Sequence, residues 1–174
     1  MKKIILFLMS IVALGFLLPE SVRIPVQGAT PADWNPRSFW YYPWGRSGAH
    51  KGIDIFAKQG TPVIAAASGL VLNADYDEMG GNFVWILSAH WRVHYYAHLQ
   101  QSTVSAGQIV KSGQALGTVG STGNASGKAP HLHYAIRSLF PLLRQLDRTA
   151  PQAWHKMFFV NPDPLLRKAS VNHE

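Results

Sequence analysis

Short apolar runs separated by glycine-containing turns follow one another through the middle of the chain. These runs cover residues 62–67, 69–74, 82–88, 92–97, 108–110 and 114–119. Runs of this length, bounded by turn residues, are typical of β-strands. Gly80 and Gly81 stand between two of the runs, and glycine readily adopts the positive φ angles of a tight hairpin. The pattern predicts a mainly β protein built on an antiparallel sheet or sandwich.

The length and composition of the chain fit one domain of this kind. The 174 residues suffice for a single apolar core. Hydrophobic residues make up 47% and charged residues 14%, with 15 Gly and 11 Pro, which suits a turn-rich β protein better than a charged helical bundle. Cysteine is absent, which excludes disulfides, cysteine nucleophiles and thiolate zinc sites. Any metal must therefore bind to histidine and carboxylate side chains.

The formal net charge of +7 favours polyanionic partners. Nucleic acid, an anionic membrane and an anionic cell wall all fit this charge. A soluble protein that is merely basic fits it equally well, because net charge says nothing about the chemistry of a site. The charge therefore leaves the partner open.

The N-terminal segment 1–20 has the layout of a signal peptide. Lys2 and Lys3 precede the apolar run 4–18, which ends before Pro19 and Glu20. The run is shorter than the roughly 18 residues of a membrane span, and no Ala-x-Ala site closely follows it. Small residues just before Ala29 offer a distant processing site. We therefore predict export to the periplasm or cell envelope, either with removal of this segment or with residues 4–18 kept as an inner-membrane anchor.

The remaining segments are assigned by their composition. Prolines and aromatic residues fill 21–45, which predicts an extended lead-in. Residues 139–146 and 152–157 are expected to be helical, separated by Ala150-Pro151.

Histidines cluster in three places along the chain. His131 and His133 are two residues apart, so on a strand both side chains leave the same face. His50 and Asp54 are four residues apart, but Gly52 between them disfavours a helix. On an extended path His50 and Asp54 share a face and the intervening isoleucine points into the core. A third segment carries His90, His94 and His98, and each segment taken alone is a weak signal.

Together these segments resemble the LytM/lysostaphin-type zinc peptidases, whose signature is His-x-x-x-Asp early in the domain and His-x-His late. The likeness continues through Gly-Thr-Pro-Val at 60–63, Ala-Ala-Ser-Gly at 66–69 and Tyr-Ala-His-Leu at 96–99. Gly-Gln-x-Val at 107–110, Gly-Gln-x-Leu-Gly at 113–117, Gly-Ser-Thr-Gly at 120–123 and Pro-His-Leu-His-Tyr at 130–134 follow in order. The resemblance spans 46–138, the expected LytM-type peptidase core, and the short Val-Asn-Pro at 160–162. It therefore implies a helical insertion over 139–158 and a closing segment and tail over 159–174. It implies a zinc endopeptidase that hydrolyses peptide bonds in peptidoglycan stem peptides or crosslinks.

The resemblance also implies the roles of particular residues. His50, Asp54 and His133 correspond to the ligands of one Zn²⁺ per chain, and His98 and His131 to the catalytic histidines. No separate cofactor-binding residues are expected. Three ligands leave a fourth position for water, whose pKa bound zinc lowers to about 7. One catalytic histidine would accept the water proton and the other would stabilise the oxyanion, and the sequence does not say which does which.

Other residues near these motifs keep two interpretations each. Arg46 either contacts a substrate carboxylate or is a solvated surface residue. His90 and His94 match no essential position, so they are assigned to structure or to the rim of the cleft. The amphipathic pattern of 139–146 indicates a helix that packs on the domain, touches membrane or binds a partner, with packing favoured.

Two other functions compete with the zinc peptidase. A metal-free LytM-like module that binds and regulates wall hydrolases would lack the ligands, which this sequence has. A nucleic-acid binder would use the tryptophans and lysines directly, but the export signal argues against it. We therefore expect peptidoglycan as the partner, membrane contact through the N-terminal segment and no nucleic acid, while the oligomeric state stays open.

Overall fold

The computed structural model describes residues 1–171 of the chain, so the end of the expected tail lies outside the described residues. The helices and strands, in chain order, are α1 (Lys2–Leu17), η1 (Gly45–Ser47), β1 (Ile53–Phe56), β2 (Pro62–Ile64), β3 (Gly69–Asp77), β4 (Gly81–Ser88), η2 (Ala89–Trp91), β5 (Arg92–Ser102), β6 (Ile109–Val110), β7 (Ala115–Val119), η3 (Gly123–Ala125), β8 (His131–Ser138), η4 (Leu143–Gln145), α2 (Ala153–Lys156), β9 (Phe159–Val160) and α3 (Pro162–Val171).

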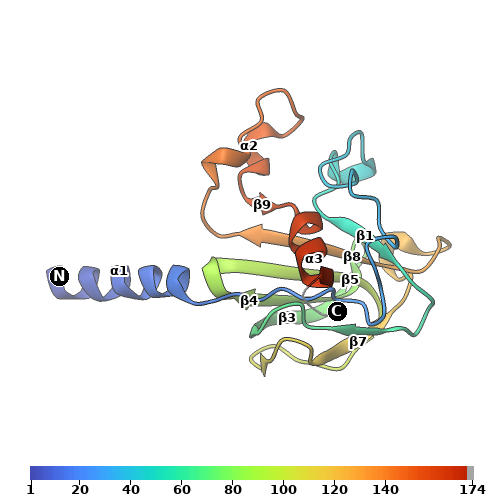
Figure 1. Ribbon diagram of the computed structural model, residues 1–174, viewed down its shortest axis with the longest axis horizontal. Helices are drawn as coiled ribbons and strands as arrows, with labels where there is room; N and C mark the ends of the chain where they lie inside the picture. The colour runs from blue at the N-terminus through green and yellow to red at the C-terminus, as the bar shows by residue number, and fades with distance from the viewer. Residues whose placement is uncertain (172–174) are drawn as a thin grey trace.

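The strands form one antiparallel sheet of nine strands, which confirms the predicted fold class. The main path runs β1-β8-β5-β4-β3-β6, while β7 pairs with β2 and β5, and β9 pairs with β8. The glycine pair turns the chain between β3 and β4, where Asp77 lies opposite Gly81. Because β5 pairs with β4, β7 and β8, it is the central strand that joins the two parts of the sheet (Figure 1).

The apolar core lies on one face of β5 and β8 and extends beneath the neighbouring strands. Tyr96, Leu132, Tyr134 and Ile136 are fully buried there. Strands alternate their side chains between two faces, so the residues between these core positions point to the other face. That second face carries the functional site.

The lead-in is part of the domain. The backbone N–H of Arg23 donates to the Ala66 carbonyl, and the N–H of Ile64 donates to the Pro25 carbonyl. Val26 is 1% exposed and belongs to the core. The indole N–H of Trp34 donates to Asp163 at the start of α3, at 2.8 Å. A cut just before Ala29 would therefore remove a core residue from the domain.

The N-terminal helix α1 projects from one end of the sheet (Figure 1) and buries none of its residues. Its contacts with the domain come from near η2, where the Trp91 indole N–H donates to the Val12 carbonyl at 2.9 Å. The rings of Phe16 and Phe140 also pack, with centroids 5.3 Å apart. Within residues 1–171, no helix has both the length and the apolar character needed to cross a membrane.

The helix expected over 139–146 is absent, so that prediction was wrong. Only the single 3-10 turn η4 forms there. Pro141 has no N–H to donate and disfavours helical backbone at Phe140, so the apolar pattern around it cannot become a regular helix. The second expected helix, over 152–157, shrinks to the four residues of α2.

Candidate active site

A cleft of about 630 Å³ lies over the face of β5 and β8 opposite the core. Ala97 of β5 and Ala135 of β8 line it, and their small side chains leave room above the sheet. The loop that carries η1 lines it on one side and residues around Lys128 line it on another. All five predicted site residues, His50, Asp54, His98, His131 and His133, line this one cleft.

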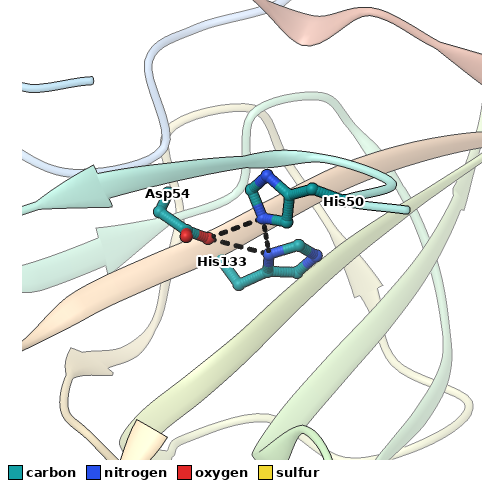
Figure 2. A group of neighbouring side chains, drawn as sticks. All are labelled: His50, Asp54 and His133. Carbon is teal, nitrogen blue, oxygen red and sulfur yellow. Dashed lines mark hydrogen bonds and ion pairs between the residues drawn. The ribbon is translucent and has the colours of Figure 1, made fainter. Parts of the chain in front are cut away.

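Three of these side chains meet at one point (Figure 2). His50 Nε2 lies 3.1 Å from Asp54 Oδ1 and 3.0 Å from His133 Nδ1. His133 Nδ1 lies 2.9 Å from the same Asp54 oxygen. His50 and His133, which are 83 positions apart in the sequence, thus converge with Asp54 to present three potential ligand atoms to one place.

The strand register explains how these residues meet. Asp54 pairs directly with His133 in the β1–β8 ladder, so both side chains leave the same face. A side chain at Gly52 would collide with the backbone carbonyl of Tyr134, so only glycine allows β1 to approach β8 here. Ile53 and Ile55 are fully buried, as the alternating pattern predicts.

The protonation of His50 favours a cation between the three atoms. Its Nδ1 lies 3.0 Å from the Ser38 carbonyl, which can only accept a hydrogen bond, so Nδ1 carries the proton. Nε2 therefore turns a lone pair toward Asp54 and His133. His50 Nε2 and Asp54 Oδ1 are then both acceptors, so the 3.1 Å between them is not spanned by a hydrogen bond.

The size of this triangle also suits zinc. Tetrahedral ligands at about 2.0–2.1 Å from Zn²⁺ lie about 3.3 Å from one another. Two imidazoles and one carboxylate form a common ligand set for catalytic zinc, which leaves the fourth position to water or substrate. The residues present therefore fit a zinc ion.

The charge on Asp54 persists despite its burial. Burial opposes ionisation, but the adjacent imidazoles of His133 and His50 outweigh it and hold the pKa of the carboxyl well below its usual range. Burial also lowers the pKa of His133, so the neutral imidazole is favoured. A carboxylate beside two neutral imidazoles is the protonation state that a divalent metal requires.

His98 and His131 face the same cleft beside the cluster. Their ring centroids lie 5.0 Å apart, and the centroid of His98 lies 6.0 Å from that of His133. Each Nδ1 is held by a backbone carbonyl, Thr122 for His98 at 3.0 Å and Ala129 for His131 at 2.8 Å. Because a carbonyl only accepts, each ring keeps its Nε2 lone pair free to accept a proton. Burial, with smaller effects from His133 and His131, lowers the pKa of His98 to about 4.

A β-bulge directs His98 into the cleft. Strict alternation from the buried His94 and Tyr96 would place His98 on the core face of β5. Instead two residues of β5, Ala97 and His98, lie opposite Phe83 alone, and His98 has a φ of 63°. The extra residue shifts the alternation by one, as bulges beside active sites commonly do.

The other predicted residues divide between the two faces. Arg46 is exposed and lines the cleft. His94 is fully buried on the core face, so it is structural and no part of the rim. His90 lies in η2, away from the cleft lining, 3.9 Å from the Glu20 carboxylate.

Several aromatic residues of the site carried no functional signal in the sequence. Trp44 packs against His50 with ring centroids 4.3 Å apart. Trp85 and Tyr95, whose centroids are 4.8 Å apart, line the cleft on neighbouring strands. Their alternation with core residues along β4 and β5 was the only available clue to their position.

Comparison with known proteins places the chain in a family. Residues 48–146 match peptidase family M23. The chain is 41% identical over 103 residues to peptidoglycan DD-endopeptidase ShyC of Vibrio cholerae, covering 59% of this chain and 23% of that protein. It is 38% identical over 113 residues to the L-Ala–D-Glu endopeptidase of Bacillus subtilis, covering 60% and 35%. The matches thus span about a quarter to a third of these relatives' own lengths.

The solved catalytic domain of lysostaphin from Staphylococcus simulans has the same fold. It superposes with a TM-score of 0.61 at 30% identity, covering 79% of this chain and 95% of that domain. The match over more than half of the chain and the shared fold lead to one conclusion: the chain belongs to peptidase family M23, the LytM/lysostaphin-type peptidases.

Proposed function

We propose that this protein is a zinc-dependent endopeptidase that hydrolyses peptide bonds in peptidoglycan stem peptides or crosslinks. The observation that carries the proposal is the convergence of His50 Nε2, Asp54 Oδ1 and His133 Nδ1 in an open cleft. These three residues are the proposed ligands of one Zn²⁺. When bound, zinc supplies a polarised water of lowered pKa and a Lewis acid for the scissile carbonyl.

His98 and His131 are the proposed catalytic residues. Their Nε2 atoms are free to accept a proton because backbone carbonyls hold both Nδ1 atoms. One ring accepts the proton of the attacking water and later delivers it to the leaving amine. The other, when protonated, donates a hydrogen bond to the oxygen on which negative charge develops. The two rings are close enough to share one reacting carbonyl.

Peptidoglycan is the proposed substrate because one relative is named a peptidoglycan DD-endopeptidase and another an L-Ala–D-Glu endopeptidase. The net charge of +7 supports an anionic cell-wall polymer as partner. We place the protein in the periplasm or cell envelope, exported through its N-terminal segment. Contact with the inner membrane through the apolar residues of α1 is part of the same proposal.

The direct test is digestion of defined crosslinked muropeptides, with products identified by mass spectrometry. We expect cleavage by the zinc-loaded protein, loss of cleavage with a chelator and recovery when zinc is restored. His133→Ala should abolish cleavage, because it removes one of three ligands. His155→Ala, a histidine away from the cleft lining, is the matched control and should cleave normally.

The same experiment separates the peptidase from a metal-free regulatory module. A protein that binds peptidoglycan, holds no zinc and yields no products would refute the proposal. Cleavage by His133→Ala at the wild-type rate would instead refute the metal assignment.

A further inference from the structure

The cleft carries more positive charge than its proposed chemistry uses. Arg46, Lys51, Lys128 and Arg137 line it, and Asp54 is its single carboxylate among the described residues. Asp54 is directed at His50 and His133, and Lys51 donates to the Ser47 carbonyl at 2.9 Å. Within residues 1–171, no carboxylate lies in ion-pair range of the other three cations. The cleft is therefore built to attract an anion.

Arg137 differs from the other cations because it stands on the strand that carries His133. Positions 133, 135 and 137 of β8 share the cleft face. Their partners on β5 are Ala97 for His133 and Tyr95 for Ala135. The short side chains of Ala97 and Ala135 leave a groove that leads along β8 from the histidine cluster to Arg137.

Aromatic side chains border this groove. Trp85 and Tyr95 pack together on one side, and Phe159, the β9 partner of Arg137, lines the cleft on the other. A substrate bound against these rings would exclude water from the groove, which strengthens the pairing of a guanidinium with a carboxylate. Arg137 itself is exposed, so a bound substrate can reach it.

The strand also fixes the spacing between Arg137 and the site of cleavage. Four residues of extended strand separate the Cα atoms of His133 and Arg137 by roughly 13 Å. A substrate that lies extended along β8 covers this distance in about four residues, or fewer once the long arginine side chain reaches back toward the cluster. A carboxylate a few residues from the scissile bond would therefore meet the guanidinium.

We propose that Arg137 is a specificity-determining residue that binds a carboxylate of the peptide substrate, so that the enzyme selects anionic stem-peptide crosslinks over neutral glycine bridges. This inference rests on the proposed function and names its substrate class. The planar guanidinium suits a carboxylate because both groups can form two parallel hydrogen bonds. Arg46 and Lys128 add long-range attraction from the rim.

The test uses two synthetic crosslinked stem peptides that differ only in one carboxylate, free in one and a carboxamide in the other, with pentaglycine as a third substrate. The zinc-loaded wild type should cleave the acid about 10- to 100-fold more efficiently than the amide, mainly through a lower KM, and pentaglycine least. Arg137→Gln should lose this preference, because its cleavage of the acid peptide slows while its cleavage of the amide does not change. Arg137→Lys should keep part of the preference. The control Arg144→Gln changes a residue outside the cleft lining and should keep the full preference.

A binding measurement keeps the inference separate from the proposed function. Calorimetric titration of each peptide into the zinc-free protein should show tighter binding of the acid, and Arg137→Gln should remove the difference. If the preference appears without any cleavage, the peptidase proposal fails and the role of Arg137 stands. If wild type treats acid and amide alike, or if Arg137→Gln weakens both equally, the inference is overturned even where chelator-sensitive cleavage occurs.

Discussion

Two carboxylates lie among histidines on opposite faces of the same pair of strands. Asp54 meets His50 and His133 on the cleft face, where its side chain is 16% exposed. Glu20 meets His94 on the core face, where its side chain is 3% exposed. His133 of the Asp54 cluster stands on β8 and His94 of the Glu20 cluster stands on the neighbouring β5, yet the two clusters have different partners and different consequences.

The Glu20 cluster is already neutralised by the protein. Arg92 forms an ion pair with Glu20, and the Ser88 hydroxyl donates to its carboxylate at 2.7 Å. His94 Nε2 lies 3.3 Å from Glu20, and its Nδ1 lies 2.6 Å from the Tyr134 hydroxyl. Every member has a partner, so this cluster fastens the lead-in to the sheet and leaves no place for an ion.

The Asp54 cluster lacks such compensation. Among residues 1–171 neither arginine nor lysine pairs with Asp54. The lone pair of His50 faces the carboxylate, an arrangement that is unfavourable without a positive charge between them. A buried carboxylate among histidines is thus structural when a guanidinium neutralises it, and it is a candidate metal site when it meets only imidazole nitrogens.

The largest expected effect is on zinc binding by the Asp54 cluster. Asp54→Asn keeps the size of the side chain but removes the charge that a divalent metal needs. We expect zinc affinity and cleavage of muropeptides to fall at least 100-fold, measured by metal content after dialysis and by product formation. Near-normal zinc content in this variant would contradict the assignment.

A change in the Glu20 cluster should instead lower the stability of the folded protein. Glu20→Gln leaves Arg92 without its counter-charge in a largely buried setting, and we expect a loss of about 3–5 kcal/mol in the free energy of unfolding. Urea denaturation of the zinc-free protein measures it. The folded variant should still bind one zinc ion per chain. A loss below about 1 kcal/mol would show that the cluster behaves like a surface ion pair.

Acid should weaken the Glu20 cluster over a defined range of pH. Burial opposes the charge on Glu20, but His94, Ser88 and Arg92 lower its pKa from 4.5 to about 2. A depressed carboxyl pKa stabilises the folded protein above the unfolded pKa, and this stability is lost as pH falls from about 4.5 toward 2. The zinc-free wild type should therefore lose stability more steeply over this range than Glu20→Gln. Parallel curves for the two proteins would contradict the pKa assignment.

The smallest expected effect follows from changing Tyr134, whose hydroxyl contacts His94 Nδ1. Tyr134→Phe removes one hydroxyl and leaves His94 Nδ1 without its partner, which should cost about 1–3 kcal/mol of unfolding free energy. Zinc content and cleavage should remain close to wild type, although Tyr134 is the neighbour of His133. Loss of zinc from this variant would show that the two clusters are coupled through β8.

The sequence predicted the local parts of this arrangement and missed the distant ones. The period of two on a strand explains why His131 and His133 share the cleft, and why Ile53 and Ile55 are buried. Periodicity alone would have put His98 on the wrong face, because nothing in the residue pattern announces the bulge. Only the resemblance to a family predicted that His98 belongs to the active site.

Contacts between residues far apart in the chain were beyond sequence reasoning. Glu20 and His94 are separated by 74 positions, and no local pattern pairs them. Trp34 and Asp163, separated by 129 positions, join the lead-in to α3 in the same way. The helix predicted over 139–146 failed for a local reason, because Pro141 interrupts its amphipathic pattern.

The central claim is that His50, Asp54 and His133 hold one zinc ion. Anomalous diffraction at the zinc edge, recorded on crystals of the zinc-loaded protein, tests it most directly. We expect one strong peak about 2.0–2.2 Å from His50 Nε2, Asp54 Oδ1 and His133 Nδ1. A zinc-loaded crystal with no peak between these atoms, or with its peak on other side chains, would contradict it.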